Sequence, residues 1–188
     1  MWAQLVKYDF DHEKKFLLVF FIGVSGLVFY FANAKNSSSL PSPKFIPMEE
    51  QKVVGFYDWA LIGPTAVQKS MYVDQNNVIL IHMWDVNDPN VVEELESLQT
   101  IYDEYKTKAQ FYFVTKNTQI EVRNFIEKHQ FTFPVYFSLS RIPKPMEFTF
   151  PTRTYLLNKK GRIVVDSKVS TNWDDDAFRL VMNNLVKQ

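Results

Sequence analysis

The chain has 188 residues, contains no cysteine and carries 21 basic and 21 acidic side chains, so its formal net charge is zero. Without cysteine it cannot form disulfides, thiolate nucleophiles, cysteine-ligated zinc sites or a lipoprotein-type cysteine anchor. The basic residues are scattered and form no stripe suited to a phosphate backbone, so nucleic acid is not expected as a partner.

An uncharged apolar run occupies residues 16–32 and as a helix would extend about 25 Å, close to the ~30 Å hydrocarbon core of a bilayer. We therefore predict a transmembrane signal-anchor helix at residues 16–34, preceded by a cytoplasmic segment at residues 1–15. Lys14 and Lys15 stand before the run, whereas only Lys35 follows it closely. The positive-inside tendency then places the domain outside the cytoplasm, and we expect the periplasmic face of a bacterial inner membrane.

Two alternatives to a retained anchor remain open. The sequence Ala32-Asn33-Ala34 fits a signal-peptidase site, and cleavage near Ala34 would release a secreted protein that begins at Lys35. The long segment before the run and the length of the run favour retention. A buried helix of a globular domain is disfavoured further, because the run has no polar face.

Residues 35–52 are rich in serine and proline and predict a semi-extended tether that lifts the following domain off the membrane. Residues 53–188 form the predicted globular domain, with an irregular or β-hairpin lead-in. The run at residues 78–84 is apolar except for His82 and does not alternate, as in a buried central strand. Asp88 and Pro89 then predict a helix start, with an aspartate N-cap and proline at the first helical position, and the helix continues to Lys106.

The rest of the domain alternates between strands and helices. Strand-helix-strand units of this length predict parallel strands joined by right-handed crossovers, followed by a β-hairpin and a closing helix. The predicted strands are 110–115, 133–137, 152–158 and 162–166, and the predicted helices are 118–129 and 174–187.

This order resembles the thioredoxin fold, and the local motifs resemble its membrane-anchored TlpA/ResA-like branch. In that family a strand ends in a Trp-rich loop, followed by Cys-Pro-x-Cys at the start of a helix. Here Trp84 matches the aromatic residue, Asp88 falls on the first cysteine, Pro89 on the proline and Val91 on the second cysteine. The resemblance therefore implies an α/β thioredoxin-like fold, a central mixed sheet flanked by helices, that lacks both reactive sulfurs.

Further along, Phe150-Pro151-Thr152 and the strand after it resemble the cis-proline loop of the same family. The resemblance implies a cis peptide bond before Pro151 and a position for Phe150 and Pro151 beside the helix start at Asp88. An X-Pro bond adopts the cis form at a cost of only about 0.5–1 kcal/mol.

No catalytic or metal-binding set emerges from the remaining residues. Asp88 is most simply a stabilising N-cap, worth about 1 kcal/mol relative to alanine. The acidic residues Glu93, Glu94 and Glu96 are interpreted as a solvated helix face. His82 and His129 have no partners at metal-ligand spacing, so we expect no metal and no cofactor.

We therefore expect a redox-inactive thioredoxin-like domain that acts as an interaction or structural module in a larger complex of membrane or periplasmic proteins. Its predicted partner-binding surface consists of Trp84, Asp88, Pro89, Val91, Phe150 and Pro151. The enzymatic alternative is a thioredoxin-family oxidoreductase or peroxidase component whose thiol comes from a partner. A third possibility is a spacer in an assembly, with Gly23 and Gly26 allowing close helix packing.

Overall fold

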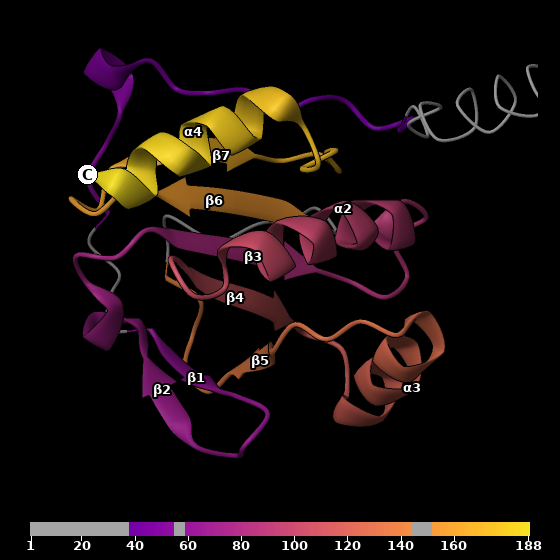
Figure 1. Cartoon of the computed structure of the whole chain (residues 1–188). Coiled ribbons are helices and arrows are strands. Elements are labelled where there is room, and N and C mark those ends of the chain that lie inside the picture. The colour runs from indigo at the N-terminus through magenta and orange to yellow at the C-terminus, as the bar shows by residue number, and fades with distance from the viewer. Residues whose placement is uncertain (1–37, 55–58, 144–151) are drawn as a thin grey trace, which may run out of the picture. The chain divides into compact units, whose positions relative to one another are not determined.

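The structure is a computed structural model of the chain, and it describes residues 38–54, 59–143 and 152–188. The predicted membrane anchor at residues 16–34 lies outside these ranges, as do Phe150 and Pro151 with the peptide bond between them (grey trace in Figure 1). Among the described residues, no helix combines the length and the apolar character that crossing a bilayer requires.

Within the described ranges, the strands and helices follow the predicted alternation (Figure 1). In chain order they are η1 (Met48–Glu50), β1 (Ala60–Ile62), β2 (Gln68–Ser70), η2 (Met71–Asp74), β3 (Ile79–Trp84), α2 (Val91–Tyr105), β4 (Gln110–Thr115), α3 (Gln119–His129), β5 (Val135–Ser138), β6 (Arg153–Leu157), β7 (Ile163–Ser167) and α4 (Asp176–Lys187). The strands form one mixed sheet in the order β2-β1-β5-β4-β3-β6-β7.

Strand β3 lies at the centre of this sheet, parallel to β4 on one side and antiparallel to β6 on the other. Strand β5 continues the parallel part beyond β4, and β6 and β7 form the predicted hairpin. The two parallel crossovers that the sequence predicted are therefore confirmed. A loop at residues 85–90 joins the carboxyl end of β3 to the start of α2.

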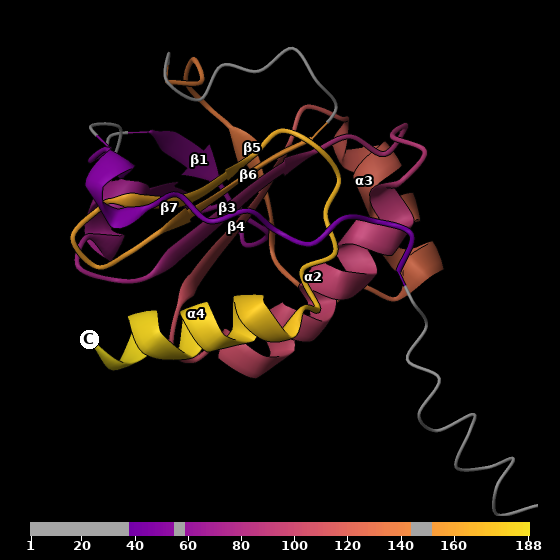
Figure 2. The same cartoon turned by 90° about the horizontal axis from the view of Figure 1, so that it is seen from above.

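The three α-helices pack on one face of the sheet, where their apolar residues join one core cluster with the even-numbered side chains of β3 (Figure 2). The odd-numbered side chains Ile79, Ile81 and Met83 point to the other face and pack with Trp59 and Leu61. A strand buried on both faces explains why residues 78–84 are apolar without alternation.

Several predicted boundaries are confirmed closely. Strand β4 spans the predicted residues, and α3 begins one residue later than predicted, because Thr118 is its N-cap. Thr118 accepts a hydrogen bond from the backbone of Glu121, and the Glu121 carboxylate accepts from the backbone of Thr118, which completes a capping box. Asp175 caps α4 in a similar way, since its carboxylate accepts from Ala177 and Phe178.

The segment predicted to be a semi-extended tether packs along the domain from Ser38 onward. The backbone N–H of Ile46 donates to Val164 in β7 at 2.8 Å, and Val53 forms a bridge with Arg162. Phe45 packs against the core on the helical side. The segment covers the outer edge of β7, and covering an edge strand protects it from pairing with other chains.

Candidate functional site: the start of helix α2

Helix α2 begins at Val91, three residues later than the predicted N-cap at Asp88. The Asp88 side chain accepts a hydrogen bond from the backbone N–H of Asn90 at 2.8 Å, and its carbonyl accepts from Val91 at 3.1 Å. Asp88 therefore closes an Asx turn ahead of the helix, and the helix cap is Asn90, which makes no side-chain capping bond. The N-cap prediction was wrong because a local Asx turn competes with capping for the same carboxylate.

The loop between β3 and α2 is held by a second Asx turn. One carboxylate oxygen of Asp85 accepts from the backbone and side chain of Asn87, both at 2.9 Å, and from Asn117 at 3.1 Å. The backbone hydrogen bond from Asn87 holds the pKa of Asp85 below its usual value. Residues 85–90 therefore form a tightly bonded connection.

The predicted partner-binding surface is mostly buried in the structure. Trp84 is 2% exposed, Val91 is 4% exposed and Asp88 is 7% exposed, whereas Pro89 is exposed. The Trp84 ring packs against Phe125 of α3 with 5.6 Å between centroids. Of the four predicted surface residues that the structure describes, only Pro89 offers its side chain to a partner.

The central feature of the site is Glu94, which was expected on a solvated face and is instead 1% exposed. Its Oε1 accepts hydrogen bonds from the Trp173 indole N–H at 3.1 Å and from the backbone of Thr171 at 3.2 Å. Its Oε2 accepts from the Thr152 hydroxyl at 3.1 Å. One carboxyl thus joins the first turn of α2 to two distant segments of the chain.

Burial raises the pKa of Glu94 to about 7, and the hydrogen bonds from Trp173, Thr152 and Thr171 oppose this shift. The charge of Asp88 adds a smaller contribution in the same direction as burial. Asp88 itself receives a long hydrogen bond from Ser170 at 3.4 Å. The site therefore combines two buried carboxyl groups, of which Glu94 changes its charge near neutral pH.

Thr152 is the residue immediately before β6. Thr152 directly follows Pro151 and lies in hydrogen-bond contact with Glu94. The chain immediately after Pro151 is therefore beside the first turn of α2. The conformation of the Phe150–Pro151 bond and the position of Phe150 lie outside the described residues and stay predictions.

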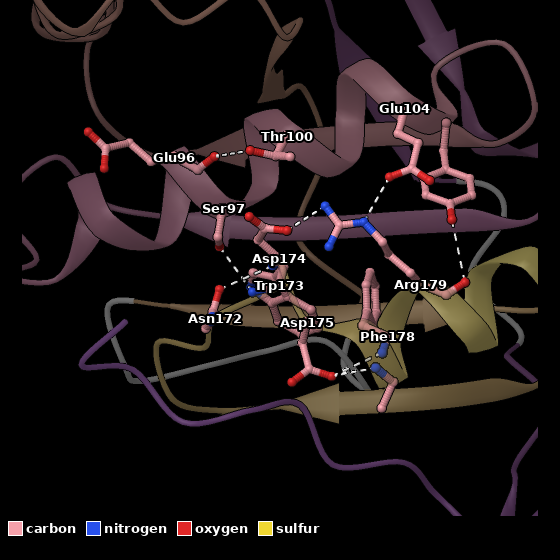
Figure 3. A network of polar contacts seen from close by, with 12 residues as sticks. Glu96, Ser97, Thr100, Glu104, Asn172, Trp173, Asp174, Asp175, Phe178 and Arg179 are labelled. Atoms are coloured by element: carbon pink, nitrogen blue, oxygen red, sulfur yellow. Dashed lines mark hydrogen bonds and ion pairs between the residues drawn. The ribbon is translucent and has the colours of Figure 1, made fainter. Parts of the chain in front are cut away.

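Further polar contacts join α2 to the start of α4 and to the segment before it (Figure 3). The Ser97 hydroxyl accepts from the Trp173 backbone at 3.0 Å and donates to the Glu94 carbonyl at 2.7 Å. Arg179 of α4 donates to Glu104 at 2.9 Å and forms an ion pair with Asp174. These bonds hold in place the segment around Trp173, which supplies donors to Glu94.

His82 offers no metal site or catalytic base. It is fully buried, its Nδ1 lies 2.8 Å from the Thr154 hydroxyl, and burial lowers its pKa to about 3. His129 packs against Phe125 with 4.7 Å between ring centroids. Across residues 38–54, 59–143 and 152–188, no group of three potential ligands among His, Cys, Asp and Glu is placed to hold a metal ion.

Glu94 is the residue that sequence reasoning missed, although a signal was present. On the helix it lies one turn after Val91 and one turn before Leu98, in the same stripe as Leu95 and Ile101, all of which are buried. A carboxylate inside an apolar stripe is the pattern that distinguishes a buried acid from a solvated one. Glu96, by contrast, is exposed as expected.

The chemistry available at the α2 start excludes thiol exchange by this chain alone. Thiol–disulfide exchange requires a thiolate, and the chain has none. The Glu94 carboxyl could exchange a proton near neutral pH, but at 1% exposure it is closed to a substrate. The arrangement is therefore a hydrogen-bonded pair of buried carboxyl groups at the start of α2.

The sheet order, the helix at the carboxyl end of β3 and the terminal β-hairpin and helix define a protein with a thioredoxin-like fold. No protein-family model matches the chain, and no curated protein matches it. Solved structures share its fold, and three of them are described next.

One is a protein from Chlorobium tepidum provisionally described as the thiol:disulfide interchange protein DsbE, with 16% identity and a TM-score of 0.59 over 79% of this chain and 99% of that one. A secreted thiol-disulfide isomerase from Corynebacterium glutamicum has 13% identity and a TM-score of 0.59, with 81% of this chain and 96% of that chain covered. Peroxiredoxin Q from Xanthomonas campestris has 18% identity and a TM-score of 0.54, with 72% and 96% covered. At these identities the likeness concerns the fold.

Proposed function

We propose that this chain is a membrane-anchored, redox-inactive thioredoxin-like protein that acts as an interaction or structural module of an extracytoplasmic assembly. The residues found at the start of α2 support the proposal. The positions that the resemblance aligns with the two cysteines hold Asp88, bonded into a turn, and Val91, buried in the core. The scaffold is kept while the group that performs its chemistry is absent.

The membrane anchor in this proposal rests on the apolar run at residues 16–32 and on the lysine distribution around it. The extracytoplasmic side is also the side on which a secreted structural relative works. A partner would meet the exposed rim of the α2 start, where Asn87, Pro89 and Asn90 are exposed around the buried acidic cluster.

Site-specific photo-crosslinking tests the interaction role. A photoreactive amino acid is placed at Asn90 or, as a matched control, at the exposed Lys160 in the hairpin turn at the other end of the sheet. In membranes of the source organism, the proposal expects one defined adduct from Asn90 and none from Lys160. Equal crosslinking from both positions, or none from Asn90, would contradict it.

The enzymatic alternative requires a thiol from a partner. A thiol titration combined with activity assays distinguishes it from the interaction proposal. The purified complex is titrated with a thiol reagent, and its disulfide reductase and peroxidase activities are compared with those of the chain alone. The interaction proposal expects no insulin reduction and no peroxide turnover by the chain alone, because no residue can form the mixed disulfide or the sulfenate. A reactive thiol in the complex that acts only when this chain is present would favour the alternative.

A further inference from the structure

A concave surface lies between α3, β5 and the turn of the β1–β2 hairpin, and it involves no residue of the α2 start. It is a cavity of about 360 Å³, open to solvent on one side. Its walls include the apolar side chains Ile62, Val122, Ile126, Phe133 and Phe137. Cavities of this size, mainly apolar with few polar groups, are the usual form of small-molecule sites.

The hairpin wall of this cavity, which we call the α3 cavity, is held close to the sheet by Gly63. A Cβ atom at Gly63 would lie 2.9 Å from Cε1 of Tyr136, a residue of β5 that points to the opposite face. The absence of a side chain therefore lets the hairpin turn lie tightly against β5. Ala66, at φ 57°, closes the turn and also lines the cavity.

The charged side chain in the lining of the α3 cavity is a basic one. Arg123 lines the cavity from the exposed side of α3, together with the amide of Gln119, and no acidic residue belongs to the lining. Within the part of the chain that the structure describes, Arg123 makes no hydrogen bond or ion pair. A planar guanidinium without a partner at the mouth of an apolar cavity complements a carboxylate attached to an apolar group.

The surrounding backbone argues against a peptide as the occupant. Strand β5 is paired with β4 and β1, and β1 is paired with β5 and β2, so neither strand offers a free edge to the cavity. Strand addition, which provides affinity in many peptide complexes, is therefore closed here. A compact molecule that fills the apolar space and pairs once at the rim fits better than an extended chain.

From these features we propose that the α3 cavity binds a small carboxylate with an aromatic or branched apolar body. The body packs against Phe133, Phe137 and Ile126, and the carboxylate pairs with the Arg123 guanidinium. This function is separate from the partner-binding rim at the α2 start, because the two surfaces share no residue.

Methyl NMR of the full chain in lipid nanodiscs, with isotope-labelled isoleucine methyl groups, tests the proposal. The probe is phenylacetate, and the matched neutral probe is phenylacetamide, which has the same shape without the charge. Phenylacetate is expected to shift the methyl signals of Ile62 and Ile126 saturably, with a roughly millimolar or tighter dissociation constant. The signals of Ile101 and Ile163, which do not line the cavity, report that the fold is unchanged.

Two variants assign the binding to the cavity. Arg123→Gln should weaken phenylacetate binding about five-fold, as expected for an exposed ion pair, whereas Lys128→Gln, which removes a charge from the same helix outside the cavity, should not. Ile126→Trp should fill the space and abolish the shift at Ile62. The proposal is overturned if phenylacetate causes no saturable shift, if phenylacetamide binds equally well, or if Arg123→Gln binds like the unaltered chain.

Discussion

The indole N–H of Trp173 donates a hydrogen bond to Glu94 across 3.1 Å, joining the first turn of α2 to the segment before α4. The two residues are 79 positions apart in the chain. Trp173 is fully buried, so the bond forms where water cannot replace it. This contact joins the buried carboxyl group at the start of α2 to a segment far away in the chain.

The pH dependence of stability should reveal Glu94. Its pKa is raised from 4.5 to about 7 by burial, so between these values the unfolded chain gives up its proton while the folded chain keeps it. Folding stability from this group is therefore highest below the unfolded pKa and falls by about 3 kcal/mol as pH rises towards the folded pKa. Thermal unfolding at about pH 5 and about pH 8 should show this loss in the unaltered chain and not in Glu94→Gln.

Glu96→Gln is the matched control for this measurement, because Glu96 is exposed on the same helix. It should retain the pH dependence of the unaltered chain. If Glu94→Gln keeps the same pH dependence as well, the raised pKa of Glu94 is wrong.

Cysteines placed at Asp88 and Val91 should form a disulfide. The Val91 N–H donates to the Asp88 carbonyl at 3.1 Å, so one turn of backbone joins the two positions, and a disulfide requires Cα atoms within about 7 Å. Mass spectrometry of the oxidised double variant Asp88→Cys with Val91→Cys should show the loss of two hydrogens. The pair Asp88→Cys with Glu96→Cys should stay reduced, because Glu96 lies about 7 Å further along the helix axis than Val91. Failure of the first pair to bridge would contradict the alignment of these positions with the family's cysteines.

Replacing Glu93 should loosen the contact between α2 and the segment that begins at Ser38. The Glu93 carboxylate accepts from the Ser38 hydroxyl at 2.6 Å and from the Ser39 backbone and hydroxyl at 2.7 Å, and these bonds lower its pKa. Hydrogen exchange at the Ser39 amide should accelerate several-fold in Glu93→Ala and stay unchanged in Glu96→Ala. Because the folded pKa is lowered, the contact should be present above the unfolded pKa and weaken as pH falls through the folded value.

Ala66→Gly should stabilise the β1–β2 hairpin. Ala66 adopts φ 57°, a left-handed conformation that costs an L-residue about 1 kcal/mol and glycine almost nothing. The gain is partly offset by the larger entropy of glycine in the unfolded chain, so we expect about 0.5 kcal/mol. Thr65→Gly in the same turn should destabilise, since Thr65 is not in this conformation. Equal effects of the two substitutions in urea unfolding would contradict the strained conformation of Ala66.

The order of strands and helices was predictable because its signals are local. The mostly apolar run at β3, the helix start at Thr118 and the β-hairpin that includes β7 depend on signals within a few residues, and each was predicted to within one or two positions. The start of α2 was the exception. Asp88 carries the residue type of an N-cap, but its Asx turn leaves the helix to begin at Val91.

For the functional site, too, some features follow from the sequence and others depend on contacts between distant segments. The sequence by itself determined that no thiol chemistry resides in this chain, and it predicted the thioredoxin-like fold. The alignment of Asp88 and Val91 with the cysteines of the family that the sequence resembles stays a prediction. Only the tertiary structure decided that Glu94 is buried, that Ser38 and Ser39 bind Glu93, and that Arg123 stands at the mouth of an apolar cavity. Burial and charge environment there depend on segments far apart in the chain, such as Thr171 and Trp173 above Glu94. Helical periodicity specifies which residues share a face, whereas the folded contacts specify what covers that face.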